Sequence, residues 1–168
     1  MTDVGIFVLR GFVGTILAAH GSQKLLGWFG GPGIDGWSAM MEKMGLRPAR
    51  LWAWLHALGE TGVGILLAIG SFTPLAAAGV VGLMAMAILL VHLPNGLWNA
   101  NGGYEFPLTL LVGGVTIGLA GAGSFALGPQ TLFGWSAAPL FVASAVTWLL
   151  IDGLLLMLRR PQTRQEPA

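Results

Sequence analysis

Five long stretches of apolar residues run along this chain of 168 residues, and short polar or glycine-rich segments separate them. Each stretch is close to the ~20 residues that an α-helix needs to cross a bilayer. The pattern therefore predicts an all-α membrane protein with five spanning helices. Their expected bounds are residues 4–26, 49–70, 74–93, 106–122 and 137–158, and the fourth is the shortest.

The loop between the first two spans has a helical pattern of its own. Apolar residues recur there at positions i, i+3, i+4 and i+7, which places them on one helical face: Trp37, Met40, Met41 and Met44. Asp35 is expected to cap this segment and Gly45 to end it. We expect a short amphipathic helix at the membrane surface, which serves either as a packing element or as a lid over a site.

The composition agrees with a membrane protein. Hydrophobic residues make up 55% of the chain and charged residues 9%, whereas soluble domains carry about 25% charged residues. So few charges do not suit a water-exposed surface, and the lipid bilayer is the expected partner. A formal net charge of +1 argues against nucleic acid as a partner. The absence of cysteine excludes disulfides, thiolate metal sites and dithiol redox chemistry.

The distribution of lysine and arginine predicts the orientation in the membrane. Basic residues are concentrated around the first loop and after the fifth span: Lys24, Lys43, Arg47, Arg50, Arg159, Arg160 and Arg164. An odd number of spans places these two regions on the same side, and basic loops face the cytoplasm. We therefore expect the N-terminus outside, with the first loop, the third loop and the C-terminus inside.

Two ionisable residues are expected near the middle of the bilayer. Arg10 lies ten residues before His20, and Glu60 lies ten residues after Arg50. Each is therefore about 15 Å from the inner end of its helix. An unpaired charge is costly in hydrocarbon, so Arg10 and Glu60 are predicted to face each other. The pair either only fixes the packing of the two helices or holds a charge for a ligand or a proton path.

Other ionisable residues collect towards the inner ends of the spans. Together with Glu60 they form one expected inner polar group: His20, Lys24, His56, His92 and Glu105. His56 and Glu60 are four residues apart and share a helical face. Asp152 lies near the inner end of the last span, seven residues from Arg159, and we expect a mostly structural role in which it reaches towards that end.

Imidazole and carboxylate groups against apolar walls suit a quinone, whose carbonyls they hydrogen-bond and whose protons they exchange. A transition metal or a haem also takes such ligands, but no spacing identifies a ligand set, so no metal ligand is assigned. The candidates for catalysis are Glu60, His92 and Glu105. The candidates for binding a quinone or another ligand are Arg10, His20, Lys24, His56 and His92.

Several motifs carry a resemblance to a known family. They are His20-Gly-Ser-Gln-Lys24-Leu with the glycine-rich run that follows, Glu60-Thr-Gly-Val-Gly64, His92-Leu-Pro-Asn-Gly96 and Asn101-Gly-Gly-Tyr-Glu105. In this order, over residues 4–125, the chain resembles the DoxX family of small bacterial membrane proteins. The resemblance implies a four-helix core in residues 1–125, in the bacterial cytoplasmic membrane. Residues 126–168 then form a loop, an added fifth helix for oligomer or partner contacts, and a basic tail.

The resemblance also implies an association with redox chemistry, because related DoxD-type subunits belong to a thiosulfate:quinone oxidoreductase. Arg10, His20, Lys24, Glu60, His92 and Glu105 match the family's recurrent polar positions, whereas His56 rests on the helical-face argument alone. A quinone-linked redox subunit is the first hypothesis. The second is a non-catalytic accessory subunit that binds other membrane subunits or a second copy of itself. A small transporter of a solute or protons ranks last, since no inverted repeat or broken helix is visible.

Overall fold

The computed structural model describes residues 1–132 and 134–159, and within them every long element is an α-helix. The helices are α1 (Thr2–Leu26), α2 (Gly33–Lys43), α3 (Ala49–Ile69), α4 (Thr73–Ala87), α5 (Glu105–Ala120) and α6 (Ala137–Leu158). Helix α4 continues through a π-helical turn, η2 (Ile88–His92), and a 3₁₀ turn, η3 (Leu93–Asn95). Two more 3₁₀ turns are η1 (Trp28–Gly30) and η4 (Asn99–Asn101). Arg160 and Arg164 lie outside the described residues.

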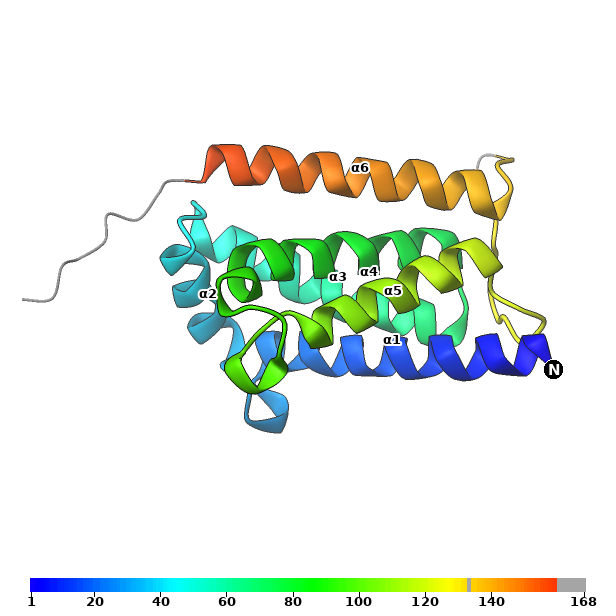
Figure 1. Cartoon of the computed structure of the whole chain (residues 1–168), viewed down its shortest axis with the longest axis horizontal. Coiled ribbons are helices and arrows are strands. Elements are labelled where there is room, and N and C mark those ends of the chain that lie inside the picture. The colour runs from blue at the N-terminus through cyan, green and yellow to red at the C-terminus, as the bar shows by residue number, and fades with distance from the viewer. Residues whose placement is uncertain (133, 160–168) are drawn as a thin grey trace, which may run out of the picture.

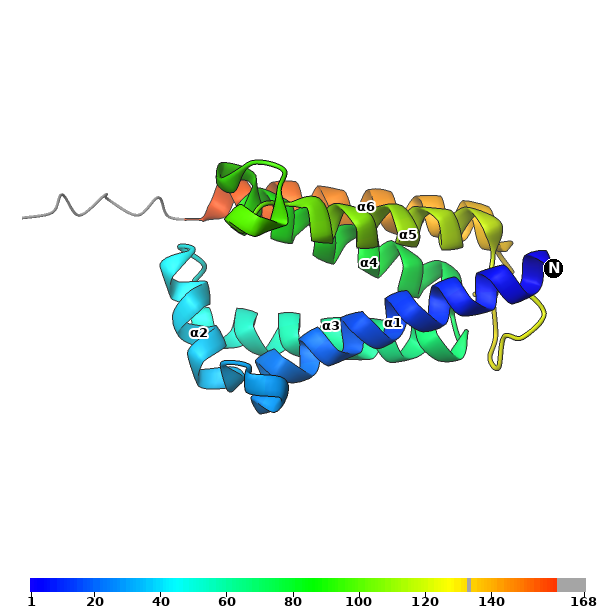
Figure 2. The ribbon, with the colours of Figure 1, turned by 60° about the horizontal axis from the view of Figure 1, so that its bottom comes forward.

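The five long helices run alternately up and down one axis, as the predicted topology requires (Figure 1). They form two layers: α1 packs on α3, while α4 packs on both α5 and α6. The layers approach each other at the end of the molecule where α1 begins and diverge towards the end where α2 lies (Figure 2). The chain is therefore an all-α bundle with one closed end and one open end.

Four of the helical segments are long and apolar enough to cross a membrane. They are Thr2–Leu26, Ala49–Ile69, Thr73–Asn95 and Ala137–Leu158. The predicted fourth span corresponds to α5, which is apolar but has only 16 residues. At 1.5 Å per residue it is about 24 Å long. Helix α5 runs alongside α4 in Figure 1. Among the described residues, four helices are therefore long enough to span a membrane, and α5 is a shorter companion.

Small residues bring α1 and α3 into very close contact. Gly14 of α1 lies against the backbone of Gly64 and Ala68 in α3, and Gly21 lies against Thr61. Glycine at these positions lets the two backbones approach as membrane helices commonly do. These contacts also fix how far the two helices are shifted along each other. The middle of α1 lies beside the last turns of α3, and the end of α1 lies beside the middle of α3.

The second layer is centred on α4, the most deeply buried helix of the described chain. The two glycines of the Gly114-x-x-x-Gly118 motif in α5 serve this packing. Gly114 lies against Val80 of α4, and Gly118 lies against the ring of Phe141 in α6. Helix α6 is therefore packed into the bundle and does not stand apart from it.

Helix α2 crosses the open end of the bundle, close to α1 and α3 (Figure 2). The expected amphipathic helix is present, with Met41 fully buried and Gly45 after its last turn at φ 80°. The expected cap is wrong, because Asp35 lies inside α2 and its carboxylate makes no capping bond. Its Oδ1 instead accepts a hydrogen bond from Arg50 Nη1 at 2.9 Å, which ties α2 to the start of α3.

The glycine contact between α1 and α3 predicts that Gly64→Ala and Gly62→Ala differ strongly in thermal stability. In Gly64→Ala the new Cβ would lie 2.7 Å from the carbonyl oxygen of Gly14, so the helices must separate. We expect a loss of about 1–3 kcal/mol of stability, measured by thermal unfolding in detergent. Gly62→Ala is the control, since its Cβ meets no atom within 4 Å. Equal melting temperatures for the two variants would contradict this account.

Candidate functional site

A cavity of about 640 Å³ lies at the open end of the bundle, and residues of both layers line it. Its walls are mainly apolar and include Trp52 of α3, Met84 of α4 and Trp148 of α6. Helix α2 covers it with the face that the sequence predicted: Trp37, Met40, Met41 and Met44. The polar side chains on its surface are His20, Lys24, His56, Glu60, His92, Asn99 and Asp152. Such a volume suits a small organic molecule.

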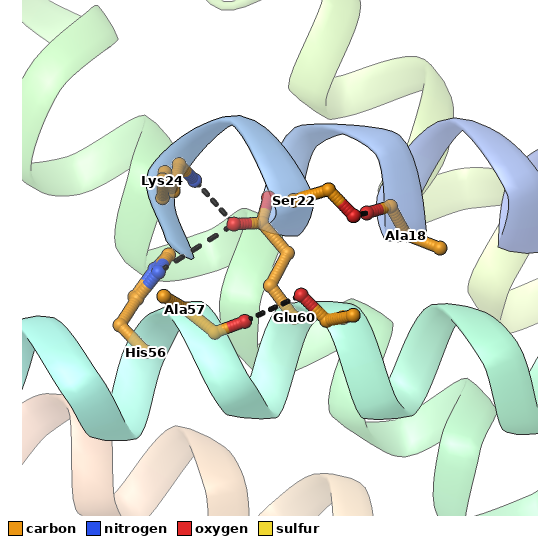
Figure 3. Close-up of polar contacts among 7 residues, drawn as sticks. Ala18, Ser22, Lys24, His56, Ala57 and Glu60 are labelled. Carbon is orange, nitrogen blue, oxygen red and sulfur yellow. Dashed lines mark hydrogen bonds and ion pairs between the residues drawn. The ribbon is translucent and has the colours of Figure 1, made fainter. Parts of the chain in front are cut away.

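A buried ion pair forms the most polar part of this cavity. Lys24 Nζ of α1 donates a hydrogen bond to Glu60 Oε2 of α3. The Glu60 side chain is only 2% exposed, and Lys24 is 18% exposed. His56 lies one turn before Glu60, and its Nδ1 is 3.6 Å from Glu60 Oε2. Figure 3 shows the Lys24, His56 and Glu60 side chains converging between the two helices. We call these three residues the Lys24 cluster.

Trp37 of helix α2 covers the Lys24 cluster. The Lys24 ammonium lies 4.6 Å from the centre of the Trp37 ring, within the range of a cation–π contact. The ring of His56 stacks at a tilt against the same tryptophan, with 5.4 Å between ring centres. Neither Trp37 Nε1 nor His56 Nδ1 has a hydrogen-bond partner among the described residues. Both residues line the cavity, so these two buried polar atoms lie close to any ligand that occupies it.

The predicted pairing of Arg10 with Glu60 is wrong. Arg10 donates from Nη1 to the carbonyl oxygen of Ala68 at 2.5 Å, and from Nη2 to that of Phe125 at 2.6 Å. The prediction placed the inner ends of α1 and α3 at one depth. Gly21 of α1 lies beside Thr61 of α3. From this contact towards the cavity end, α1 has only five more residues, to Leu26, whereas α3 has twelve, back to Ala49. Glu60 is therefore level with Lys24, and Arg10 lies far from the cavity.

Arg10 instead stabilises the closed end of the bundle. It is fully buried, and the carbonyls of Leu67 and Ala68 that face it belong to the last turn of α3. The last carbonyls of a helix carry its negative dipole end, which favours a cation; that of Leu67 also accepts the N–H of Gly70. Gly70 ends α3 at φ 73°, and a Cβ there would lie 2.7 Å from the Arg10 guanidinium. Glycine is required at position 70 for both reasons.

Two other predicted histidines line the cavity outside the Lys24 cluster. The ring of His20 packs 5.4 Å from the ring of Phe106 on α5. His92 ends the π-helical turn η2, and its Nδ1 lies 2.7 Å from the carbonyl oxygen of Gly102. A carbonyl only accepts hydrogen bonds, so Nδ1 carries the proton, and Nε2 of a neutral ring is left as an acceptor. Single π-helical turns are frequent at functional sites.

Glu105, another predicted candidate, does not line this cavity. Its side chain is exposed at the start of α5, where Oε2 accepts a hydrogen bond from the backbone N–H of Asn99 at 3.0 Å. That bond holds the polar loop between α4 and α5. The candidate residues therefore fall into three places: five of them line the cavity, Arg10 lies at the closed end, and Glu105 lies at the start of α5, where it bonds the loop.

Asp152 was expected to have a mostly structural role and to reach towards the inner end of its helix. In the structure its side chain is buried at 4% exposure and lines the cavity. Its Oδ2 has no hydrogen-bond partner among the described residues. A signal was present, because a carboxylate within a membrane span is a functional candidate by default. Only the orientation of α6 shows which of its faces meets the cavity.

The cavity residues supply hydrogen-bond donors and acceptors, but not a compact set of metal ligands. Within residues 1–132 and 134–159, no three histidine or carboxylate groups come close enough to hold one ion. The site suits an organic ligand with a polar head, bound between apolar walls.

These features define a multi-pass α-helical membrane protein with a covered cavity at one end. The sequence profile of the DoxX family matches residues 5–93, which hold α1 to α4 and the Lys24 cluster. The chain belongs to the DoxX family, as its motifs indicated. A search of curated proteins and a search of solved structures each found no match to the chain.

The Lys24–Glu60 ion pair leads to a prediction of stability. Lys24→Met leaves a carboxylate buried without its cation, which typically costs about 3–5 kcal/mol. Adding Glu60→Gln removes the buried charge, so the double variant should regain much of that loss. Thermal unfolding of both single variants and the double variant in detergent measures this coupling. Additive effects of the two changes would show that the ion pair does not stabilise the bundle.

The role of Arg10 is tested by replacing it with methionine, which fills similar space without donors. The carbonyls of Ala68 and Phe125 then lose the Arg10 donor, while that of Leu67 keeps the N–H of Gly70. We expect a loss of about 3 kcal/mol or more, since bonds to charged groups are worth about 1.5–3 kcal/mol each. Ligand affinity should be unchanged in protein that remains folded, because Arg10 does not line the cavity. A specific loss of ligand binding with unchanged thermal stability would contradict this assignment.

Proposed function

We propose that this protein is a quinone-binding membrane subunit of a redox system, with the quinone ring held in the cavity under α2. The observation that supports this most is the combination of one large apolar cavity with a few buried polar groups that face it. Quinones are apolar rings with carbonyl oxygens, so they need both apolar walls and hydrogen-bond donors. The volume of about 640 Å³ lies within the usual range for small-molecule sites.

The Lys24 cluster supplies the donors that a ring carbonyl needs. Lysine has three N–H donors, and Glu60 uses one of those of Lys24. The others are available to a ligand oxygen. Lys24 also takes the role that was predicted for Arg10, because it provides the positive charge that faces the Glu60 carboxylate. The ring head of the ligand is therefore expected beside Lys24 and under Trp37.

His56 and Glu60 are suited to hold and pass a proton. Their 3.6 Å separation is longer than a hydrogen bond and becomes one after a shift of about half an ångström. His56 is the acid–base group and Glu60 its carboxylate partner on the same helix. His92, with Nε2 as an acceptor, and His20 offer further contacts at the cavity wall. Glu105 has no part in this proposal.

Electron transfer to or from the quinone requires a partner chain. This chain has no cysteine, and its described residues bring no three metal-ligating groups together. We therefore propose a membrane complex in which this subunit provides the quinone site and a partner provides the redox centre. The basic residues Lys43, Arg47 and Arg50 lie at the end of α2, in the loop after it and at the start of α3, respectively, at the end of the bundle that α2 covers. That end is proposed to face the bacterial cytoplasm.

A transporter is less well supported by the same geometry. The cavity lining comes from the halves of the long helices that lie near α2, and towards the opposite end α1 packs closely on α3 and Arg10 bonds the end of α3. A cavity with one polar end and one closed end is better suited to binding a ligand from one side.

Binding of a decyl-substituted benzoquinone to the detergent-purified protein tests the proposal. Trp37, Trp52 and Trp148 line the cavity, so a bound quinone should quench their fluorescence. Ala87→Phe places a ring at the cavity wall and should abolish the saturable quenching. Ala120→Phe is the matched control, because the same change falls on an exposed residue at the far end of α5.

Mass analysis of an organic extract of the purified wild-type protein shows whether it already carries a quinone. Failure of the wild-type protein to bind the quinone, or equal quenching in the Ala87→Phe variant, would overturn the proposal. Co-purifying partner chains without quinone binding would instead support the accessory-subunit hypothesis.

A further inference from the structure

Asp152 is a buried acidic residue that the proposed quinone contacts leave unexplained. It lies on one face of α6 with Trp148 one turn before it and Leu155 about one turn after it, and all three line the cavity. Its side chain is 4% exposed, and Oδ2 has no hydrogen-bond partner among the described residues. A buried polar atom without a hydrogen-bond partner destabilises the fold, and more strongly if it is charged. A ligand that supplies a donor removes this cost.

Helix α6 lies in the layer opposite to the one that carries the Lys24 cluster. Glu60 belongs to the layer of α1 and α3, and Asp152 belongs to the layer of α4, α5 and α6 (Figure 2). Both side chains line the same cavity. A ligand between the two layers therefore has polar groups on two sides, with Lys24, His56 and Glu60 on one wall and Asp152 on the other.

The orientation of Asp152 is held by tight packing one turn away. Trp148 lies directly on Gly82 of α4, and a Cβ at Gly82 would be 2.8 Å from Trp148 Cβ. Helix α6 cannot rotate about its axis without breaking this contact. The face with Asp152 is thus kept towards the cavity. Asp152 lies outside residues 5–93, the range that the DoxX profile matches.

We propose that Asp152 accepts a hydrogen bond from a hydroxyl group of the ligand, so that the cavity selects the hydroquinone over the quinone. This inference rests on the proposed function. An ionised carboxylate only accepts hydrogen bonds. A hydroquinone presents two opposed O–H donors, one for each wall, whereas a quinone presents two carbonyl acceptors. Glu60 or His56 receives one hydroxyl and Asp152 receives the other.

Comparison of three ligands separates this inference from the proposed function. They are decyl-benzoquinone, its hydroquinone and the dimethyl ether of that hydroquinone, all titrated by tryptophan fluorescence under anaerobic conditions. The wild-type protein should bind the hydroquinone about tenfold or more tightly than the quinone or the ether, as expected for a hydrogen bond to a charged group. Only the hydroquinone offers the hydroxyl donors that the carboxylate needs.

Asp152→Asn is the decisive variant, because it keeps the size of the side chain and adds a donor. It should lose the preference for hydroquinone by about tenfold. Asp3→Asn is the matched control, because it makes the same change in charge at the opposite end of the bundle. There the Asp3 carboxylate accepts a hydrogen bond from the Ser124 hydroxyl. If the asparagine variant does not fold, Asp152→Leu takes its place, and the same loss of preference is expected.

The outcomes are distinct. If the wild-type protein binds none of the three ligands, the proposed function fails and this inference fails with it. If the protein binds quinone and hydroquinone in a ratio that Asp152→Asn leaves unchanged, the quinone site stands and the role of Asp152 is refuted. A preference that falls in the Asp152 variants and persists in Asp3→Asn supports the assignment.

Discussion

The half of this bundle that holds the cavity depends on the ion pair between Lys24 and Glu60. A carboxylate that is only 2% exposed, within a helix built to cross a membrane, needs a nearby positive charge. Lys24 supplies that charge from the neighbouring helix, and Trp37 of α2 covers the lysine. One interaction therefore joins α1 to α3, helps to hold α2 over the cavity, and creates a polar region on an otherwise apolar wall.

The two ends of the molecule are built by different means. At the closed end, glycines let helix backbones touch, and Arg10 satisfies carbonyls at the end of α3. At the other end the layers separate, and a short amphipathic helix covers the space between them (Figure 2). The closed end provides a rigid base, so that the residues around the cavity are held in position by packing elsewhere in the bundle.

Helix α6 is part of the site and not an appendage to it. It packs on α4, where Trp148 lies on Gly82, and it contributes Asp152 to the cavity wall. A helix outside the matched family range thus completes the wall opposite the Lys24 cluster.

The sequence by itself determined the helices, because the spacing of apolar residues, glycines and prolines acts locally. It predicted the long apolar helices and the amphipathic α2. Five of the polar residues that it singled out line the cavity. It did not determine which residues meet. The pairing of Lys24 with Glu60 depends on how far α3 extends past α1, and the exposure of Asp152 to the cavity depends on the rotation of α6. Both are decided by contacts such as Gly21 with Thr61 and Gly82 with Trp148, which join residues far apart in the chain. Periodicity within one helix carries no information about its level or rotation relative to another, so only the tertiary structure decides them.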